Sequence, residues 1–388
     1  MPGLTGHHFN VMPGLTGHLK DCVMWREMGV VLGALVVMFW NVENFFDWRN
    51  DSTTVSDLEF SAAGERHWTW KRFQAKANAF AKALFWVEGE TGRLPDIVGL
   101  EEVENAFVLR QILQKTALRK TGYKYVHYDS PDRRGIDVAL LYRPSRLELL
   151  DSKPCHLYAA DTVMGTRDIL LCVFRHKFPG RTHSVIPDLT GNLPAYRQQM
   201  TDQVGPDDSY ARFAVLVNHH PSKYGGSAES EPLRRIAVER LRALADSLAA
   251  IGIDRIIAGG DFNDNPDNPV FRLLEPVLRP LHRNLFRQGQ GTIKYDGKWD
   301  LIDHVYVSPS WSDMPATEGL SSPANITHPF ETRQVISSPT MRILHIPFLL
   351  TRDTVHSGEE PLRTYTGPRH TGGVSDHLPV LLEIVWPP

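Results

Sequence analysis

The chain has 388 residues, of which 42% are hydrophobic and 22% charged, a composition typical of a folded globular protein and unlike that of a disordered one. Its formal net charge is −3, so overall electrostatics give no support for tight nonspecific binding to DNA, although local basic patches stay open. Three cysteines without a CxxC pair predict neither a disulfide framework nor a cysteine-based zinc site.

The N-terminal segment, 1–33, is atypical. The heptapeptide MPGLTGH stands at 1–7 and again at 12–18. One short duplication cannot build a stacked repeat protein, so the segment reads as an appendage. We therefore expect a single domain over 34–388.

The apolar run 28–40 lies at the border of this domain. It is too short to span a bilayer, so we expect no membrane span. Lys20 and Arg26 precede it as in a secretory signal, but no cleavage motif follows. We interpret the run as a buried strand that begins near Ala34, and a cytoplasmic and a secreted location both stay open.

Short apolar runs with the length and composition of strands recur along the chain and alternate with helical patterns. Helical periodicity covers 70–84, 105–118 and 233–248, and Gly252 ends the last of these helices. This alternation predicts an α/β domain. The predicted strands are 34–40, 96–100, 137–142, 168–174, 212–217, 254–259, 304–308 and 378–385.

Two further stretches, 176–211 and 309–374, are rich in turn-forming residues and contain no element that the pattern assigns. Loops of this length are often functional or mobile.

Polar clusters stand at the ends of six predicted strands. In a sheet with both strand directions, the starts of some strands lie beside the ends of others, so the six clusters can meet at one rim. A single cluster is more often ordinary turn chemistry, but six together favour a site. The clusters are Asn41 to Asn44, Glu101 and Glu102, Asn218 to His220, Asp261 to Asp264, Asp303 and His304, and Asp376 and His377.

The residue types of these clusters indicate a chemistry. Carboxylate and amide oxygens suit Mg²⁺ or Mn²⁺, and histidines serve as general acids or bases. The combination fits metal-assisted attack of water on a phosphoester.

A calcium loop is the alternative interpretation of the fourth cluster. Asp261, Asn263 and Asn265 have the spacing of EF-hand ligands. That loop then requires glycine and glutamate where this chain has Pro266 and Arg272. We therefore reject the EF-hand.

Six motifs together resemble a known family. In this order, over about 36–386, they are similar to the motif set of the endonuclease/exonuclease/phosphatase superfamily, and most of all to its nuclease-type branch. The resemblance implies the deoxyribonuclease I-like fold, a four-layer α/β/β/α sandwich of two mixed β-sheets, and divalent-metal-dependent hydrolysis of phosphoester bonds with Mg²⁺ or Mn²⁺. The motifs are WNVENFFD, DIVGLEEVEN, VNHHPSKYGG, GGDFND, LIDHVYVS and GVSDHLPV.

The resemblance also assigns metal and phosphate positions. Asn41, Glu102 and Asp376 match residues of the family's metal site. Arg167 resembles a phosphate-contacting arginine, and a surface ion pair is the alternative for this residue.

Five further residues match the family's catalytic positions. His377 corresponds to the general base and Asp303 to the aspartate that orients it. Asp261 and Asn263 correspond to the pair that orients water and phosphate, and His219 to the histidine that assists the leaving group or binds the phosphate.

Three residues beside these motifs raise further expectations. Glu101 stands where glutamine is common, which predicts an extra negative charge near the metal. His220 is also unusual and is expected to contact substrate or to cap a turn. Asp137 is a candidate orienting partner for His219, with an ordinary strand-edge aspartate as the alternative.

The substrate is less determined than the chemistry. Nucleic acid is the substrate that the NHHPSKYGG motif favours, with a small or lipid phosphoester as the alternative and a silent binding protein as a third. A silent protein would be expected to have lost Glu102, Asp261 or His377, and all three are present. No protein partner is implied, and we expect a monomer.

Overall fold

The computed structural model describes five parts of the chain, which are called the described residues: 34–49, 55–177, 212–223, 227–311 and 338–385. The predicted N-terminal segment, 1–33, lies outside them, so its separation from the domain stays a prediction.

The first sheet, sheet A, has six strands and both strand directions. Strands β1 and β2 run parallel, and each other neighbouring pair is antiparallel. The order in space is β15 (Thr340–Ile343), β20 (Val380–Val385), β1 (Ala34–Phe45), β2 (Ile97–Val103), β4 (Asp137–Tyr142) and β3 (Lys124–His127).

The second sheet, sheet B, repeats this plan. Strands β9 and β10 run parallel, whereas the other neighbouring pairs are antiparallel. The order in space is β11 (Arg279–Pro280), β14 (Asp303–Val307), β10 (Ile256–Asp261), β9 (Arg212–His219), β8 (Ile169–His176) and β5 (Leu147–Cys155).

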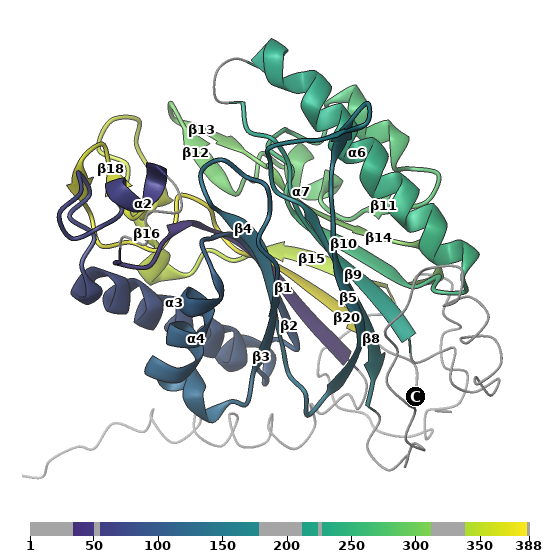
Figure 1. Cartoon of the computed structure of the whole chain (residues 1–388), viewed down its shortest axis with the longest axis horizontal. Coiled ribbons are helices and arrows are strands. Elements are labelled where there is room, and N and C mark those ends of the chain that lie inside the picture. The colour runs from purple at the N-terminus through teal and green to yellow at the C-terminus, as the bar shows by residue number, and fades with distance from the viewer. Residues whose placement is uncertain (1–33, 50–54, 178–211, 224–226, 312–337, 386–388) are drawn as a thin grey trace, which may run out of the picture.

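Helices cover the outer face of each sheet (Figure 1). Sheet A packs against α3 (Trp70–Thr91), α4 (Ala106–Lys115) and η1 (Ala117–Lys120), and sheet B packs against α6 (Ser227–Ala250). The smaller helical elements are α2 (Val55–Glu59), η3 (Pro269–Leu273), α7 (Arg283–Arg287), η4 (Pro309–Trp311) and η5 (Pro347–Leu349).

Four two-stranded ribbons extend the loops. They pair β6 (Tyr158–Ala159) with β7 (Thr162–Val163), β12 (Ile293–Tyr295) with β13 (Lys298–Asp300), β16 (Leu350–Arg352) with β17 (Glu359–Pro361), and β18 (Tyr365–Thr366) with β19 (Arg369–His370).

The core has three parts, as a four-layer sandwich requires. One lies between sheet A and its helices, with Phe73, Phe80 and Leu84 on the buried face of α3. A second fills the space between the sheets, and a third lies between sheet B and α6. The predicted α/β/β/α architecture is confirmed.

Phe39 shows how closely the two sheets pack. Its ring lies against Gly99 of β2 and, across the inter-sheet core, against Gly259 of β10. A Cβ atom at either glycine would stand within 2.5 Å of the ring, closer than any real side-chain contact. Both positions therefore require glycine.

All eight predicted strands and the three predicted helices are present. The strands that lead to the rim are longer than expected, because the backbone ladder continues through the polar clusters: β1 reaches Phe45, β2 Val103, β9 His219 and β10 Asp261. Strands β3, β5 and β15 were not predicted, since they are edge strands or carry mostly half-buried residues. None of the helices in the described residues is long and apolar enough to cross a membrane.

Candidate active site

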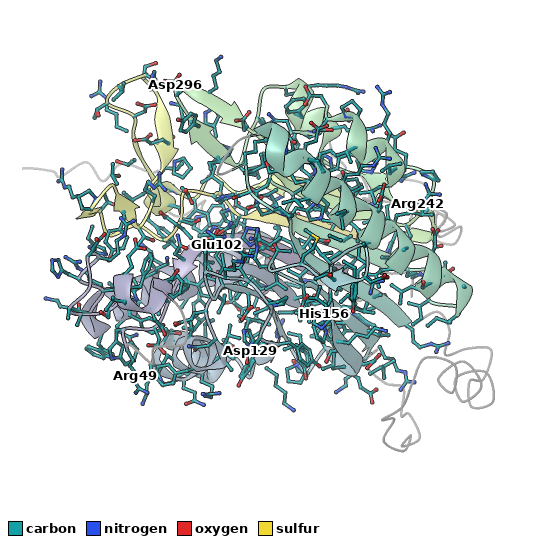
Figure 2. The ribbon with its side chains drawn as sticks, turned by 45° about the horizontal axis from the view of Figure 1, so that its top comes forward. Arg49, Glu102, Asp129, His156, Arg242 and Asp296 are labelled. Atoms are coloured by element: carbon teal, nitrogen blue, oxygen red, sulfur yellow. The ribbon has the colours of Figure 1, made fainter. Side chains whose placement is uncertain are left out.

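The polar clusters meet where the ends of β1 and β2 in sheet A face the ends of β9 and β10 in sheet B. The carboxyl ends of two parallel pairs lie together there, and β14 starts beside the end of β10, with Asp303 opposite Asp261. Figure 2 shows Glu102 near the middle of the molecule, between the layers. The convergence that the strand-end pattern predicts is therefore present.

A single carboxylate oxygen, Oδ2 of Asp261, lies at the centre of this rim. It accepts hydrogen bonds from the side-chain amides of Asn41 at 3.0 Å and Asn263 at 3.1 Å. Nε2 of His219 lies 3.6 Å from it, and Nε2 of His377 lies 3.9 Å from it. Four of the predicted residues thus surround one oxygen atom of a fifth.

The protonation of Asp261 is finely balanced. Burial raises its pKa to about 7, while His377 and the amide donors lower it and Asp303 raises it. The donors are needed because a buried carboxylate without partners is costly.

His377 is fixed by a carboxylate on its other ring nitrogen. Nδ1 lies 2.8 Å from Oδ2 of Asp303. Burial opposes the charged imidazolium, but Asp303, Asp261 and Asp376 outweigh it and raise the pKa of His377 well above its usual value. This pair has the arrangement of an oriented general base, with Nε2 directed at the rim.

The backbone at the rim adopts conformations that non-glycine residues rarely take. Glu43, Asn44, Glu102 and Asn263 have φ values of 45°, 51°, 65° and 54°. Such strain, of about 1 to 3 kcal/mol per residue, persists where the surrounding structure enforces it and is typical of active sites.

A β-bulge explains the position of Glu102. The register of β2 shifts between Glu101 and Val103. Without the bulge, strand alternation would turn the side chain of Glu102 away from the inter-sheet side. Instead Oε1 lies 3.8 Å from Nε2 of His219 in the other sheet, and Oε2 accepts from the backbone N–H of Asn44 at 2.8 Å.

Asp376 lies at the outer side of the same rim. Its Oδ1 is 4.0 Å from Nε2 of His377, and its Oδ2 accepts from Nη2 of Arg363 at 2.9 Å. Arg363 also contacts Glu43, with Nε 3.3 Å from Oε1. Burial, followed by the negative charge of Asp376, raises the pKa of Glu43 to about 7.

His219 lies at the rim in an environment that disfavours its protonated form. Burial and the nearby cations Arg167 and Arg134 hold its pKa well below its usual value. Nε2 faces the carboxylates, and Nδ1 is buried with no partner in the described residues. The expected partner, Asp137, binds His127 at 3.0 Å instead, so it does not orient His219.

Arg167 contacts the backbone behind the rim rather than the opening of the site. Its guanidinium is buried and donates to Asp132 at 3.0 Å and to the backbone carbonyl of His220 at 2.7 Å. Asn263 donates to the same carbonyl at 3.0 Å. Arg167 therefore braces the segment that carries His219, and its contact with phosphate stays a prediction.

Glu101 lies in an environment that disfavours its charged form. Its side chain is fully buried, and neither carboxyl oxygen has a partner in the described residues. Burial, with Asp303 and Asp261 nearby, raises its pKa well above the usual range. The extra negative charge near the metal stays a prediction.

His220 does not line the opening of the site. Its ring is buried against Phe262, with centroids 4.4 Å apart, and neither ring nitrogen has a partner among the described residues. The side chain fills the core under the rim, and the carbonyl makes the polar contacts.

The oxygen atoms at the rim suit a divalent cation. The carboxylates of Glu102 and Asp376 keep 12% and 25% of their side-chain surface exposed, and Oδ1 of Asn41 accepts from the N–H of Glu43 with one lone pair left. Hard oxygen donors of this kind are typical Mg²⁺ ligands.

A second group, outside the predicted site, also has ligand atoms within 4.8 Å of one another: His127, Asp129 and Asp137. The two ring nitrogens of this histidine face different carboxylates, Nε2 toward Asp137 and Nδ1 toward Asp129. A histidine held between two carboxylates accounts for the group without an ion.

Comparison with known proteins gives the family. A model described as endonuclease/exonuclease/phosphatase family matches residues 36–184 and 206–385. The chain belongs to the endonuclease/exonuclease/phosphatase family. It is accordingly a metal-dependent phosphoester hydrolase with the fold that the motifs implied.

Solved structures are similar to this chain at low identity. A family protein from Bacteroides thetaiotaomicron is 16% identical, with 92% of this chain and 98% of that one covered and a TM-score of 0.49. A mannosyl-6-phosphatase of the same species is 16% identical over 90% and 99%, with a TM-score of 0.49. The human Nocturnin catalytic domain with bound sulfate is 17% identical over 90% and 93%, with a TM-score of 0.48. No curated protein sequence matches the chain at a significant level.

Two cations flank the carboxylates of the rim. Nη2 of Arg134 lies 3.8 Å from Glu102, and Arg363 binds Asp376, with 43% and 47% of the side chains exposed. In the sequence both lie outside the family motifs, among basic residues near the predicted rim loops that are candidates for phosphate contact. The fold shows that these two lie beside the carboxylates.

Proposed function

We propose that the chain is a phosphodiesterase of the endonuclease type, which cuts nucleic acid with Mg²⁺ or Mn²⁺. The observation that carries this proposal is the arrangement around Oδ2 of Asp261, with two amide donors and two histidines within 4 Å. A carboxylate with such neighbours can orient a water molecule so that the water gives a proton to a neighbouring imidazole.

His377 is the proposed general base. Its Nδ1–H is held by Asp303, which fixes the tautomer with Nε2 free to accept a proton from water. Asp303 then stabilises the imidazolium that forms. Asp261, which faces both Nε2 and the amides, orients the attacking water.

The phosphoryl group is proposed to lie against the neutral donors. The side-chain amide of Asn41 and Nε2 of His219 are directed into the rim, whereas both N–H groups of the Asn263 amide are used by Asp261 and the carbonyl of His220. Such preorganised donors stabilise the charge that builds up on phosphoryl oxygens in the transition state. His219 is assigned a hydrogen bond from Nε2–H to the phosphoryl group, because an imidazole whose pKa is lowered is a poor source of a proton for the leaving oxygen.

Glu102, Asp376 and Asn41 are the residues that would hold the metal ion. A divalent cation supplies charge neutralisation for the phosphoryl oxygens and the leaving group. The carboxylates are the two most exposed acids of the rim, so a hydrated ion can reach them. Neutralising them also removes part of the field that raises the pKa of His377, which favours the basic form.

Nucleic acid is proposed as the substrate because cations flank the acidic rim. Arg134 and Arg363 are half-exposed on either side of it, and Lys223 is exposed nearby in ion-pair contact with Asp264. Cationic side chains around a catalytic centre are placed to contact phosphates adjacent to the one that reacts.

The test is cleavage of supercoiled plasmid with Mg²⁺, with EDTA, and with His377→Ala. Nicking that needs the metal and is lost in the variant is the expected result. Turnover of bis(4-nitrophenyl) phosphate without any cleavage of DNA or RNA would contradict the nucleic-acid substrate and leave the chemistry intact.

A compact phosphoester is the second candidate, favoured by a polar pocket of about 160 Å³ beside Arg363. Its lining includes Glu43, Asn44, Arg66 and Tyr365, which can bind a small polar group. Release of inorganic phosphate from small monoesters, faster than any cleavage of nucleic acid, would favour this candidate.

A further inference from the structure

A strongly basic stretch lies outside the active site. Residues 106–128 contain five lysines and arginines and no aspartate or glutamate, in a chain whose net charge is −3. The five are Arg110, Lys115, Arg119, Lys120 and Lys124.

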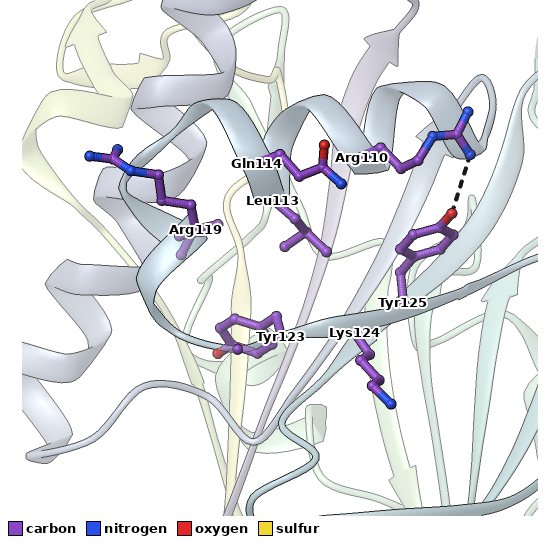
Figure 3. A pocket seen from close by; sticks show the side chains of 9 residues that line it. Arg110, Leu113, Gln114, Arg119, Tyr123, Lys124 and Tyr125 are labelled. Carbon is purple, nitrogen blue, oxygen red and sulfur yellow. Dashed lines mark hydrogen bonds between the residues drawn. The ribbon is translucent and has the colours of Figure 1, made fainter.

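This stretch folds around a groove of about 590 Å³. Figure 3 shows Arg110, Gln114 and Arg119 on one side, from α4 and η1, and Tyr123, Lys124 and Tyr125 on the other, along β3 and the residue before it. Leu113 and Leu118, which are buried, complete the lining.

The cations of the groove have no carboxylate partner in the part of the chain that the structure describes. Arg110 donates to the hydroxyl of Tyr125 at 3.3 Å, and Arg119 donates to the carbonyl of Thr116 at 3.3 Å. The side chains of Arg110, Arg119 and Lys124 are exposed. Their charge is therefore not neutralised within this part of the molecule.

We propose that this groove binds the phosphate backbone of nucleic acid as a second contact, apart from the active site. The inference rests on the proposed function. Arginine, lysine, glutamine and tyrosine are side chains that contact phosphate oxygens, and unpaired cations favour a polyanion over a neutral ligand.

The cations of the groove come from three successive elements. Arg110 lies on α4, Arg119 on η1 and Lys124 on β3, and the extended backbone of Thr116 separates the two helices. A phosphate backbone that follows the groove can therefore contact cations from all three elements.

The groove lies at a definite distance from the catalytic centre. Lys124 is opposite Tyr142, which is opposite Ile97, and Ile97 is five residues before Glu102 on β2. Strand rise and strand spacing place Lys124 about 20 Å from Glu102, or about six base-pair steps along the axis of a duplex. A duplex that reaches both sites along its axis must therefore be longer than about six base pairs.

The test uses the variant Arg110→Gln/Arg119→Gln/Lys124→Gln, in which exposed side chains change, with Mg²⁺ present. We expect kcat/KM for a fluorescent 20-nucleotide substrate to fall at least tenfold. For a 4-nucleotide substrate and for bis(4-nitrophenyl) phosphate it should stay within twofold. The slope of log Kd for the 20-mer against log salt, measured in EDTA, should fall by about 2 to 3.

The matched control is Arg235→Gln/Arg272→Gln/Arg287→Gln, which removes three exposed arginines elsewhere, on α6, η3 and α7, and should behave as wild type. If the groove variant binds and cuts the 20-mer as wild type does, the groove proposal is overturned and the proposed function stands. If wild type hydrolyses the small diester but no nucleic acid, the proposed function itself is contradicted, whatever the groove variant does. Poly-L-glutamate that displaces the 20-mer as strongly as unlabelled DNA does would indicate that the groove binds an acidic protein. That result would overturn the assignment of nucleic acid to the groove.

Discussion

Nδ1 of His377 lies 2.8 Å from Oδ2 of Asp303, so a residue at the end of the sequence is aligned by one that is 74 positions earlier and belongs to the other sheet. The alignment depends on the sandwich as a whole, because Trp40 of β1 also donates to the carbonyl of His377 at 2.9 Å. Two sheets and one loop thus fix a single imidazole.

Asp303→Asn tests this relationship. The amide keeps the shape but can favour the wrong tautomer of His377 and cannot stabilise the imidazolium, so kcat should fall about 10³- to 10⁴-fold with little change in KM. Because Asp303 raises the pKa of His377, the acid limb of the pH–rate profile should also move to lower pH. Hydrolysis of bis(4-nitrophenyl) phosphate with Mg²⁺ over pH 5 to 10 is the measurement.

The control for this variant is the fold itself. Unchanged circular dichroism with full activity would exclude Asp303 as the residue that orients the base. An activity loss without a shift of the acid limb would mean that Asp303 acts on the structure rather than on the imidazole.

Glu102→Gln should weaken the binding of Mg²⁺ and leave the fold unchanged. A carboxylate that binds Mg²⁺ contributes charge as well as an oxygen ligand, so the Mg²⁺ concentration for half-maximal activity should rise at least tenfold. Activity titrated with Mg²⁺ at fixed substrate gives this value. An unchanged titration would remove Glu102 from the proposed metal ligands.

Glu104→Gln is the matched control. Burial, with a hydrogen bond to Asp57, raises the pKa of Glu104 to about 10, so it is neutral at pH 7 and glutamine is a close replacement. Its Mg²⁺ titration should equal that of wild type.

Gly259→Ala tests the packing between the sheets. A methyl group there would stand 2.4 Å from the ring of Phe39, so we expect a loss of about 1 to 3 kcal/mol in the free energy of unfolding. The double variant with Phe39→Leu should recover part of it. Gly89→Ala, on α3 with no atom within 4 Å of the added methyl, should instead be neutral or slightly stabilising. Equal urea midpoints for Gly259→Ala and wild type would contradict this account.

The sequence sufficed for the layers and for most of the rim because both depend on local patterns. Apolar runs of strand length predict the central strands, and the motif order predicts that Asp261 and His377 converge. What it could not supply is set by geometry between distant segments. The bulge that turns Glu102 inward, the burial that raises the pKa of Glu101 and the pairing of Asp137 with His127 follow from register and packing, which no local pattern encodes.

The buried histidine His220 predicts a pH-dependent stability. Burial, with Arg167 and Arg234 nearby, lowers its pKa to about 3, whereas in the unfolded chain a histidine titrates near pH 6.5. Between these values the unfolded state binds the additional proton, so stability falls as pH drops below about 6.5. For this residue alone the loss from pH 7 to pH 5 is about 2 kcal/mol.

His220→Phe should remove that contribution. Its ring already packs against Phe262 in a tilted arrangement, and neither nitrogen has a partner in the described residues. Phenylalanine should therefore be neutral or stabilising at pH 7 and more stabilising at pH 5. His304→Phe makes the comparison specific, because Nε2 of His304 lies 3.1 Å from the carbonyl of Leu301, and loss of that hydrogen bond should cost about 1 kcal/mol at pH 7. Urea unfolding at pH 7 and pH 5 measures both variants. Parallel pH dependence in wild type and His220→Phe would show that His220 is protonated to the same extent in the native and unfolded states, against the buried, neutral imidazole of this structure.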